Sequence, residues 1–223
     1  PIPSLIVKAG SPEYPHLAVN EYLCLDAARR AGIAVPSFAL SDDGQLLIIE
    51  RFDLVTLENG HVERLGFEDI AALAGLRVRD IHSDRKYHGS YQRVAELLRQ
   101  LQLHSDNLKR FFGQVAFSIM VSNGDAHLKN FGVLYRSTTD IWLAPMFDVV
   151  TTSIYKYARY PGGPELVDHT LALKLFAGKH SKQYPSTEQL HDFGRRLCGV
   201  SQPGRTLAAI ADAMRETLLV AKG

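Results

Sequence analysis

The chain has 223 residues, a length that predicts one domain or one lobed unit rather than a string of modules. Apolar residues make up 46% of it and charged residues 22%, so a packed core is available and wholesale disorder is excluded. Its 25 Lys and Arg residues against 24 Asp and Glu residues leave a net charge of +1. That balance excludes a protein that holds nucleic acid by charge alone.

The cysteines and the apolar runs do not indicate export or a membrane. Cys24 and Cys198 stand far apart without a Cys-x-x-Cys pattern, so we expect two buried thiols rather than a disulfide or a zinc site. The longest apolar stretch, 115–121, is far shorter than the ~20 residues that a membrane span needs. No basic region followed by an apolar one opens the chain. We therefore expect a soluble cytoplasmic protein that has no membrane partner.

The first 53 residues predict a strand, a helix and a hairpin. Residues 5–9 form a short apolar run that ends in a Gly-Ser-Pro turn. Residues 20–31 are good helix formers and are followed by Gly32, the residue favoured just past a helix end. Two β-like runs, 34–40 and 45–52, then flank an Asp-Asp-Gly turn, which is typical of a hairpin.

The pattern beyond residue 53 is mainly helical. Apolar residues recur at helical spacing over 67–76, 94–101 and 108–121, and Ser105 or Asp106 is placed to cap the last of these helices. A β-like pair follows at 131–135 and 141–144. The tail, 187–221, predicts two helices broken near residues 202–204. A basic stretch over 77–86 is interpreted as a solvated helix end.

The loop at residues 123–130, Asn-Gly-Asp-Ala-His-Leu-Lys-Asn, carries the most chemistry in the sequence. It joins the most apolar helix to a β-like run, and Asp148 follows the second run, so Asp125, Asn130 and Asp148 should lie near one end of a hairpin. Asp-x-x-x-x-Asn with a distant Asp is the spacing of the catalytic and metal loops of protein kinases. Phosphoryl transfer needs a carboxylate for the proton of the attacking hydroxyl, and an amide with a second carboxylate for Mg²⁺.

Two upstream features fit the same chemistry. Lys8 ends a predicted strand and Glu21 lies near the start of the next helix, as in the ion pair that grips the phosphates of ATP in kinases. A lone strand lysine is otherwise a solvated edge charge, so both interpretations stay open. Residues 50–53, Glu-Arg-Phe-Asp, stand where a hinge would pair with adenine, and Phe52 would either pack on the base or belong to the core.

Taken together, these residues resemble the HipA family of bacterial Ser/Thr kinase toxins. The loop 123–130 with Phe147-Asp148 carries most of the resemblance. Further segments along most of the chain look like those of the family: 5–8, 19–22, 32–36, 50–53, 65–69 and 171–175.

The resemblance implies an α+β, protein-kinase-like fold with a truncated small lobe, residues 1–53, and a mainly α-helical large lobe, residues 54–223. It also implies roles for individual residues. Asp125 would accept the proton, and Asn130 and Asp148 would hold Mg²⁺. The nucleotide, ATP, would be bound by Lys8, Glu50, Arg51, Phe52, His127, Leu128, Lys129 and Asn130.

The activity that the resemblance implies is that of an ATP-dependent serine/threonine protein kinase toxin of a toxin–antitoxin system. Its protein substrate would be an aminoacyl-tRNA synthetase. Its partner would be a HipB-like helix-turn-helix antitoxin, and DNA would be contacted only through that complex. The loop that covers the phosphates in the family is absent ahead of Lys8, which leaves the activity of the isolated chain open.

Two alternatives stay open. A small-molecule kinase of the aminoglycoside or choline type shares Asp-x-x-x-x-Asn, but the segments 50–53 and 171–175 argue against it. A kinase-like module that binds its antitoxin and DNA without turning over ATP is the other alternative.

Overall fold

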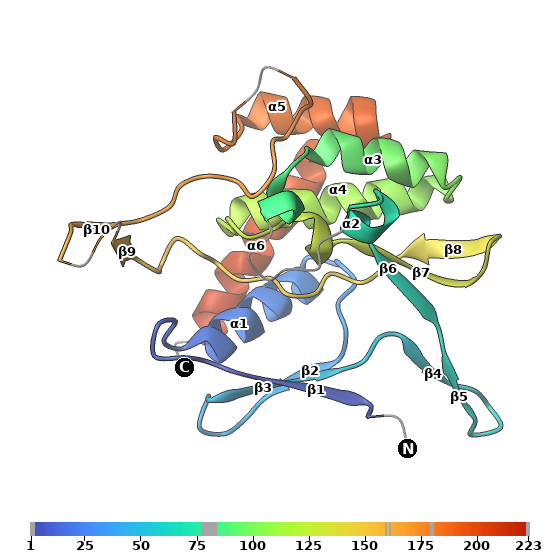
Figure 1. Cartoon of the computed structure of the whole chain (residues 1–223), viewed down its shortest axis with the longest axis horizontal. Helices are drawn as coiled ribbons and strands as arrows, with labels where there is room; N and C mark the ends of the chain where they lie inside the picture. Colours follow the sequence, from blue (N-terminus) through green and yellow to red (C-terminus); the bar gives the residue numbers. More distant parts are fainter. Residues whose placement is uncertain (1–2, 77–83, 159, 161, 179–180, 222–223) are drawn as a thin grey trace.

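The computed structural model describes residues 3–76, 84–158, 160, 162–178 and 181–221. Figure 1 shows a small sheet with one helix at one end of the molecule and a mainly helical part at the other. The sheet is antiparallel in the order β1-β3-β2, with Lys8 of β1 opposite Leu47 of β3. Its strands are β1 (Leu5–Ala9), β2 (Phe38–Leu40) and β3 (Leu46–Glu50). The predicted first strand and hairpin are confirmed, although β2 and β3 are shorter than predicted.

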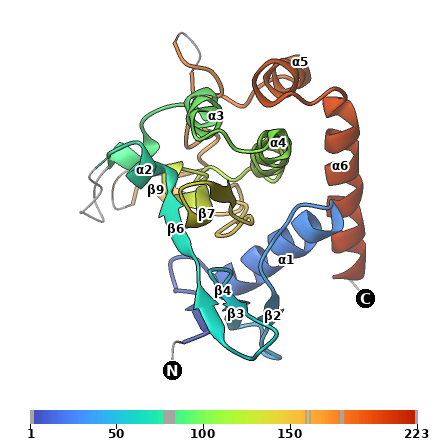
Figure 2. The same cartoon turned by 90° about the vertical axis from the view of Figure 1, so that its right-hand side faces the viewer.

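Helix α1 (Leu17–Arg30) packs against the small sheet and begins earlier than predicted. It ends where the sequence predicts, because Gly32 has a φ of +78°, a left-handed conformation that glycine adopts without strain. Helix α6 (Pro203–Val220) packs against α1, as Figure 2 shows. The buried Asp26 of α1 accepts a hydrogen bond of 3.2 Å from Thr217 of α6, which ties the C-terminal helix to the small sheet's helix.

Residues 66–69 form a strand, which corrects the prediction of a helix over 67–76. Strand β6 (Gly66–Asp69) pairs antiparallel with β7 (Gly132–Ser137), and only α2 (Ile70–Leu73) is helical. The cause is a distant partner: a Cβ on Gly66 would lie 2.2 Å from the ring of Tyr135, so this glycine lets β6 approach β7. The spacing of apolar residues within one segment cannot predict such packing against a distant strand. The hairpin of β4 (Leu54–Thr56) and β5 (Val62–Arg64) was also not predicted.

The remaining predicted elements are confirmed, with shifted ends. They include the β7–β8 pair and the two tail helices, of which α6 opens on Pro203. His104, not Ser105 or Asp106, caps the apolar helix, because the helix already begins at Ser105. The elements of this part are η1 (Asp84–Tyr87), α3 (Tyr91–Gln100), α4 (Ser105–Met120), η2 (Leu128–Asn130), β8 (Asp140–Leu143), β9 (Tyr157–Ala158), β10 (Glu165–Leu166), α5 (Thr187–Asp192) and η3 (Phe193–Leu197).

The main core surrounds α4, whose Phe111 and Phe112 are fully buried and pack against Phe193 of η3. Two amides inside this core fix α4 to the end of β8. Gln114 donates a 2.9 Å hydrogen bond to the Ala144 carbonyl, and Asn107 accepts one of 2.9 Å from the Leu143 N–H. These bonds pair buried backbone groups, and they hold the end of β8 against α4.

Both thiols, Cys24 and Cys198, are free and buried, as predicted. Of the basic stretch, Arg77 and Arg79 lie outside the described residues, and Arg85 and Lys86 belong to the 3₁₀ turn η1 rather than to a helix end. In the part of the chain that the structure describes, no helix combines the length and apolar character needed to cross a membrane. The division into two lobes at residue 53 stays a prediction.

Candidate active site

The loop after α4 is held from both sides by short hydrogen bonds. The Asp125 N–H donates to Asn123 Oδ1 at 3.0 Å, inside the loop. The Gly124 N–H donates to Thr152 Oγ1 at 2.8 Å, and the Thr152 hydroxyl donates to the Ser122 carbonyl at 3.0 Å. Thr152 therefore bridges two backbone groups of this loop and fixes the position from which Asp125 extends.

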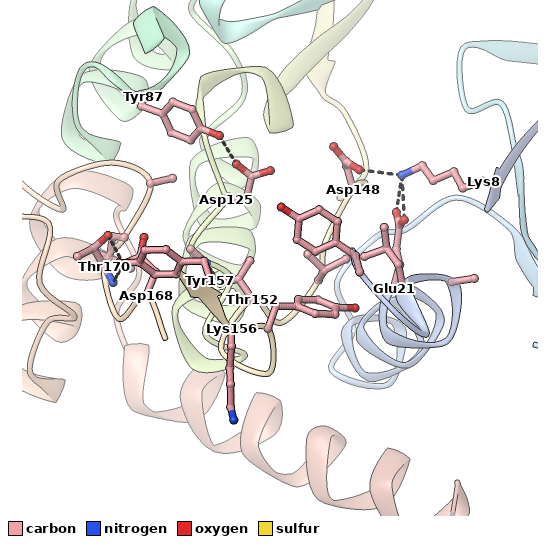
Figure 3. A pocket seen from close by; sticks show the side chains of 18 of the residues that line it. Lys8, Glu21, Tyr87, Asp125, Asp148, Thr152, Lys156, Tyr157, Asp168 and Thr170 are labelled. Carbon is pink, nitrogen blue, oxygen red and sulfur yellow. Dashed lines mark hydrogen bonds and ion pairs between the residues drawn. The ribbon is translucent and has the colours of Figure 1, made fainter. Parts of the chain in front are cut away.

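Four charged or polar side chains from separate segments, Lys8, Glu21, Asn130 and Asp148, form one connected cluster. Lys8 Nζ lies 2.7 Å from Glu21 Oε1 and 2.8 Å from Asp148 Oδ1. Asn130 Nδ2 donates to Asp148 Oδ2 at 2.8 Å, so both carboxylate oxygens of Asp148 are engaged. Figure 3 shows Lys8 between the two carboxylates. The predicted Lys8–Glu21 pair is thus formed, and it lies directly beside the predicted metal ligands.

Burial and charge set the ionisation of this cluster. The side chain of Glu21 is only 4% exposed, and burial raises the pKa of its carboxyl, although the Lys8 ammonium opposes this shift. Burial works against the charged form of Lys8, but the carboxylates of Asp148 and Glu21 outweigh it and raise the pKa of Lys8. The ammonium therefore stays charged at neutral pH.

Asp125 extends into a cavity of about 860 Å³ that also contains Lys8, Glu21 and Asp148 on its wall. Its carboxylate accepts a 2.5 Å hydrogen bond from the hydroxyl of Tyr87 (Figure 3). Half of the Asp125 side chain is exposed, which leaves it accessible to an incoming hydroxyl group. The catalytic carboxylate predicted from the sequence and the predicted phosphate lysine thus share one cavity.

Residues 127–130 of the loop differ in burial and in their contacts. Asn130 Oδ1 accepts a 3.0 Å hydrogen bond from the His127 N–H, which closes the turn η2 and aims the amide at Asp148. His127 is buried, and burial lowers the pKa of its imidazole. Leu128 is buried in the main core and Lys129 is exposed. This cavity is not lined by His127, Leu128 or Lys129, and neither is a second cavity that lies beside Phe52. Their predicted nucleotide contacts therefore stay a prediction.

The second cavity, of about 800 Å³, lies at the other end of β1, where Leu5 and Ile6 line it. Arg51 and Phe52 of the predicted hinge line it, whereas Glu50 does not. Phe52 packs against Phe147 and Phe67, with ring centroids 5.3 and 5.5 Å away, so it contributes both to a small core and to the cavity wall. Phe147 and Asp148 are neighbours in sequence and face the two cavities separately.

Three residues that hold the site together were not predicted to do so. Asn20 Nδ2 donates to the Thr151 carbonyl at 2.9 Å, and Asn20 Oδ1 accepts from the Thr151 N–H at 3.0 Å. This pair of bonds ties α1, which carries Glu21, to the segment just after Asp148. Tyr87 and Tyr91 donate hydrogen bonds to Asp125 and to the Ala126 carbonyl in the loop after α4. Asn20 has a signal in the sequence, because it is a polar residue on an otherwise apolar helix face. The two tyrosines lie far from the loop in the chain, so no sequence pattern links them to it.

The side chains suit a hard cation that is bound together with phosphate. Asn130 and Asp148 present an amide and a half-exposed carboxylate next to each other, and Asn130 Oδ1 has a second lone pair beyond its bond to the His127 N–H. Among the described residues there is no cluster of three or more His, Cys, Asp or Glu side chains able to hold a metal. Mg²⁺ is commonly held by one or two protein ligands plus phosphate oxygens, so this pair fits it.

Known proteins share this sequence pattern and fold. The model of the HipA-like C-terminal domain family matches residues 3–221. Two relatives, each named "Putative kinase", are 29% identical to the chain: one from Sinorhizobium fredii over 68% of this chain and 38% of its own length, one from Haemophilus influenzae over 77% and 50%. The chain thus spans half or less of the length of these relatives.

Two solved structures share the fold. A chain in the complex of Shewanella oneidensis HipA, HipB and operator DNA matches with a TM-score of 0.70, at 21% identity, over 97% of this chain and 52% of that one. The kinase CtkA of Helicobacter pylori matches with a TM-score of 0.51, at 13% identity, over 97% and 91%. The predicted α+β, protein-kinase-like fold is confirmed, and the chain belongs to the HipA-like C-terminal domain family.

Proposed function

We propose that the protein is a serine/threonine protein kinase that transfers the γ-phosphoryl group of ATP. The observation that carries this proposal is that Lys8, Glu21, Asp125 and Asp148 line one cavity. Asn130 joins them through its hydrogen bond to Asp148. These groups supply the three requirements of phosphoryl transfer: a cation for the phosphates, ligands for Mg²⁺ and a base for the acceptor hydroxyl. The kinase names and folds of the relatives agree with it.

ATP is expected to lie along β1. Lys8 near one end of β1 would hold the phosphates, and the cavity at Phe52 and Phe147 near the other end of the strand would take the adenine. Aromatic rings offer an apolar wall to a planar base. The neighbouring Phe147 and Asp148 then link the two ends of the nucleotide, because one faces the base cavity and the other faces the phosphates.

Asn130 and Asp148 are the proposed ligands of Mg²⁺. The cation, when bound, neutralises the charge on the phosphate oxygens during transfer. Asn130 also orients Asp148 through its 2.8 Å hydrogen bond. As long as no nucleotide is present, the Lys8 ammonium balances the negative charge of Asp148 through the ion pair of 2.8 Å.

Asp125 is the proposed proton acceptor. The oxygen of the acceptor hydroxyl forms a bond to the γ-phosphorus, and the bond from that phosphorus to the bridging oxygen of ADP breaks, with its electron pair left on ADP. The hydroxyl proton passes to the Asp125 carboxylate, which is half exposed and therefore accessible.

The proposed acceptor is a protein hydroxyl, on an aminoacyl-tRNA synthetase, and the proposed setting is a cytoplasmic toxin–antitoxin system. The structural relative from Shewanella oneidensis was solved with HipB and operator DNA, which supports a HipB-like helix-turn-helix antitoxin as the partner. DNA would then be contacted through that complex.

The test uses the protein expressed from its whole reading frame, γ-³²P-labelled ATP, Mg²⁺ and a panel of purified aminoacyl-tRNA synthetases. We expect labelled phosphoserine or phosphothreonine on one synthetase, and its loss in Asp125→Asn. Labelling of an aminoglycoside or of choline instead would show a small-molecule kinase. ATP binding without any transfer would show a non-catalytic module.

A further inference from the structure

We propose that Tyr87 is a positioning residue for Asp125: its phenolic O–H fixes the carboxylate so that the second oxygen faces the acceptor. This inference rests on the proposed function. The Tyr87 hydroxyl lies 2.5 Å from Asp125 Oδ1. Figure 3 shows the other Asp125 oxygen directed away from Tyr87, towards the side of the cavity where Asp148 lies.

The direction of this hydrogen bond is fixed by chemistry. A carboxylate only accepts, so the phenol must be the donor, and it must stay protonated to donate. Burial, together with the bond to Asp125, raises the pKa of Tyr87. The phenol therefore keeps its proton throughout the physiological range of pH.

Tyr87 is itself held in place on several sides. Its ring packs edge-on against the His127 ring, with centroids 5.1 Å apart, and the ammonium groups of Lys86 and Lys182 lie 5.0 and 5.6 Å from its centroid. Cation–π contacts of this kind favour one ring orientation. Four residues further along the chain, the fully buried Tyr91 at the start of α3 donates a 2.9 Å hydrogen bond to the Ala126 carbonyl. The two tyrosines thus donate hydrogen bonds to consecutive residues of the proposed catalytic loop, Asp125 and Ala126.

Within the described residues, Tyr87 is the side chain that donates a hydrogen bond to the Asp125 carboxylate. His127 Nε2 is 3.9 Å away, too far for a hydrogen bond, and burial lowers the pKa of His127 so that this imidazole is neutral at pH 7. The bond from Asn123 reaches only the backbone of Asp125. Without Tyr87, the half-exposed carboxylate would be free to rotate, and a base in variable orientation reacts more slowly.

Tyr87→Phe removes the hydroxyl and keeps the ring. In the kinase assay with γ-³²P-labelled ATP, with casein as a general acceptor protein, we expect kcat to fall about tenfold, the usual effect of losing a hydrogen bond to a charged group. KM for ATP should stay within about twofold, because Tyr87→Phe keeps the ring that packs on His127 and removes only the hydroxyl that is bonded to Asp125. Tyr22→Phe is the matched control: it removes a phenol hydroxyl from α1, where the ring packs on Phe38 away from the cavity.

A double-mutant cycle separates positioning from a general structural effect. If Tyr87 acts through Asp125, Tyr87→Phe will cause no further loss in an Asp125→Asn protein. An unchanged or higher kcat in Tyr87→Phe, or an equal loss in both backgrounds, would overturn the inference.

The contact can also be tested without activity. NMR of protein labelled with ¹³C at tyrosine Cζ, assigned by Tyr87→Phe, should show a shift of the Tyr87 resonance in Asp125→Asn and none in Tyr22→Phe. An unmoved resonance overturns the inference about Tyr87. A wild-type protein that transfers no phosphate instead counts against the proposed function, and the NMR result is independent of it.

Discussion

Lys8 and Asp148 are 140 positions apart in the sequence, and a hydrogen-bonded ion pair of 2.8 Å joins them. The same ammonium donates to both carboxylate oxygens of Glu21, at 2.7 and 3.0 Å, so all three of its N–H donors are used. A phosphate that binds Lys8 must therefore displace one of these three oxygens, and displacement of the half-exposed Asp148 would free that carboxylate for a cation. The small sheet and the loop after β8 are thus coupled through one lysine.

The first prediction concerns this lysine. Lys8→Met leaves the buried Glu21 without its cation, so we expect kcat/KM for ATP to fall about ten- to a hundredfold, the range for charge-assisted hydrogen bonds. The control is Lys109→Met, which removes a surface ion pair with Asp106 of 2.8 Å. Such exposed pairs contribute little, so this variant should keep the kinetics of the wild type. Equal effects of the two substitutions would contradict the role of Lys8.

The second prediction concerns the clamp between α1 and the segment after Asp148. Asn20→Ala leaves the N–H and the carbonyl of Thr151 without their partners at 3.0 and 2.9 Å. We expect the free energy of unfolding to fall by about 1–3 kcal/mol, as measured by urea denaturation. Asn59→Ala is the control, because it removes a single bond of 2.9 Å to the His61 N–H in an exposed turn. If Asn20→Ala costs no more than Asn59→Ala, the clamp is not a significant restraint.

The third prediction is that alanine at two glycine positions changes the stability of the protein in opposite directions. A Cβ on Gly124 would lie 2.8 Å from Thr152 Oγ1 and 3.0 Å from the Thr170 carbonyl, so Gly124→Ala should displace the loop that carries Asp125. We expect a loss of stability of about 1–3 kcal/mol, together with reduced activity. Gly113→Ala lies within α4 and meets only Ile33 at 3.7 Å, so it should stabilise by up to about 1 kcal/mol. Thermal unfolding of both variants tests this, and the same sign for both would contradict it.

The fourth prediction follows from the buried thiols. Burial raises the pKa of Cys24 and that of Cys198 to about 12 each, so neither forms the reactive thiolate in the folded protein at pH 8. Ellman's reagent should therefore label no thiol in the native chain and both in guanidinium. The pKa values of the folded chain exceed the ordinary thiol value of 9.0, so the unfolded chain loses these protons first, and the free energy of unfolding falls as the pH rises above about 9. Rapid labelling of the native chain would contradict this prediction.

The sequence predicted well what depends on neighbouring residues. Local patterns predicted the strand that carries Lys8, the helix ended by Gly32 and the spacing of Asp125 and Asn130. The structure places Lys8 and Asn130 against Asp148, and Asp125 in the same cavity as Asp148.

The features that the sequence did not predict depend on contacts between distant segments. Strand β6 forms because β7 passes beside it, and Tyr87 reaches Asp125 from a position 38 residues earlier in the chain. No spacing rule connects such residues. The loop geometry at Asp148, with a φ of +55°, is likewise visible only in the folded chain.

The most direct test of the central claim is transfer of ³²P from γ-labelled ATP to protein in the presence of Mg²⁺, compared between the wild type and Asp125→Asn. A melting temperature that rises with the concentration of ATP and Mg²⁺ shows whether each protein still binds the nucleotide. If Asp125 is the proton acceptor, Asp125→Asn will lower transfer by about 10²–10⁴-fold and keep this rise in melting temperature. Undiminished transfer by Asp125→Asn would contradict the account.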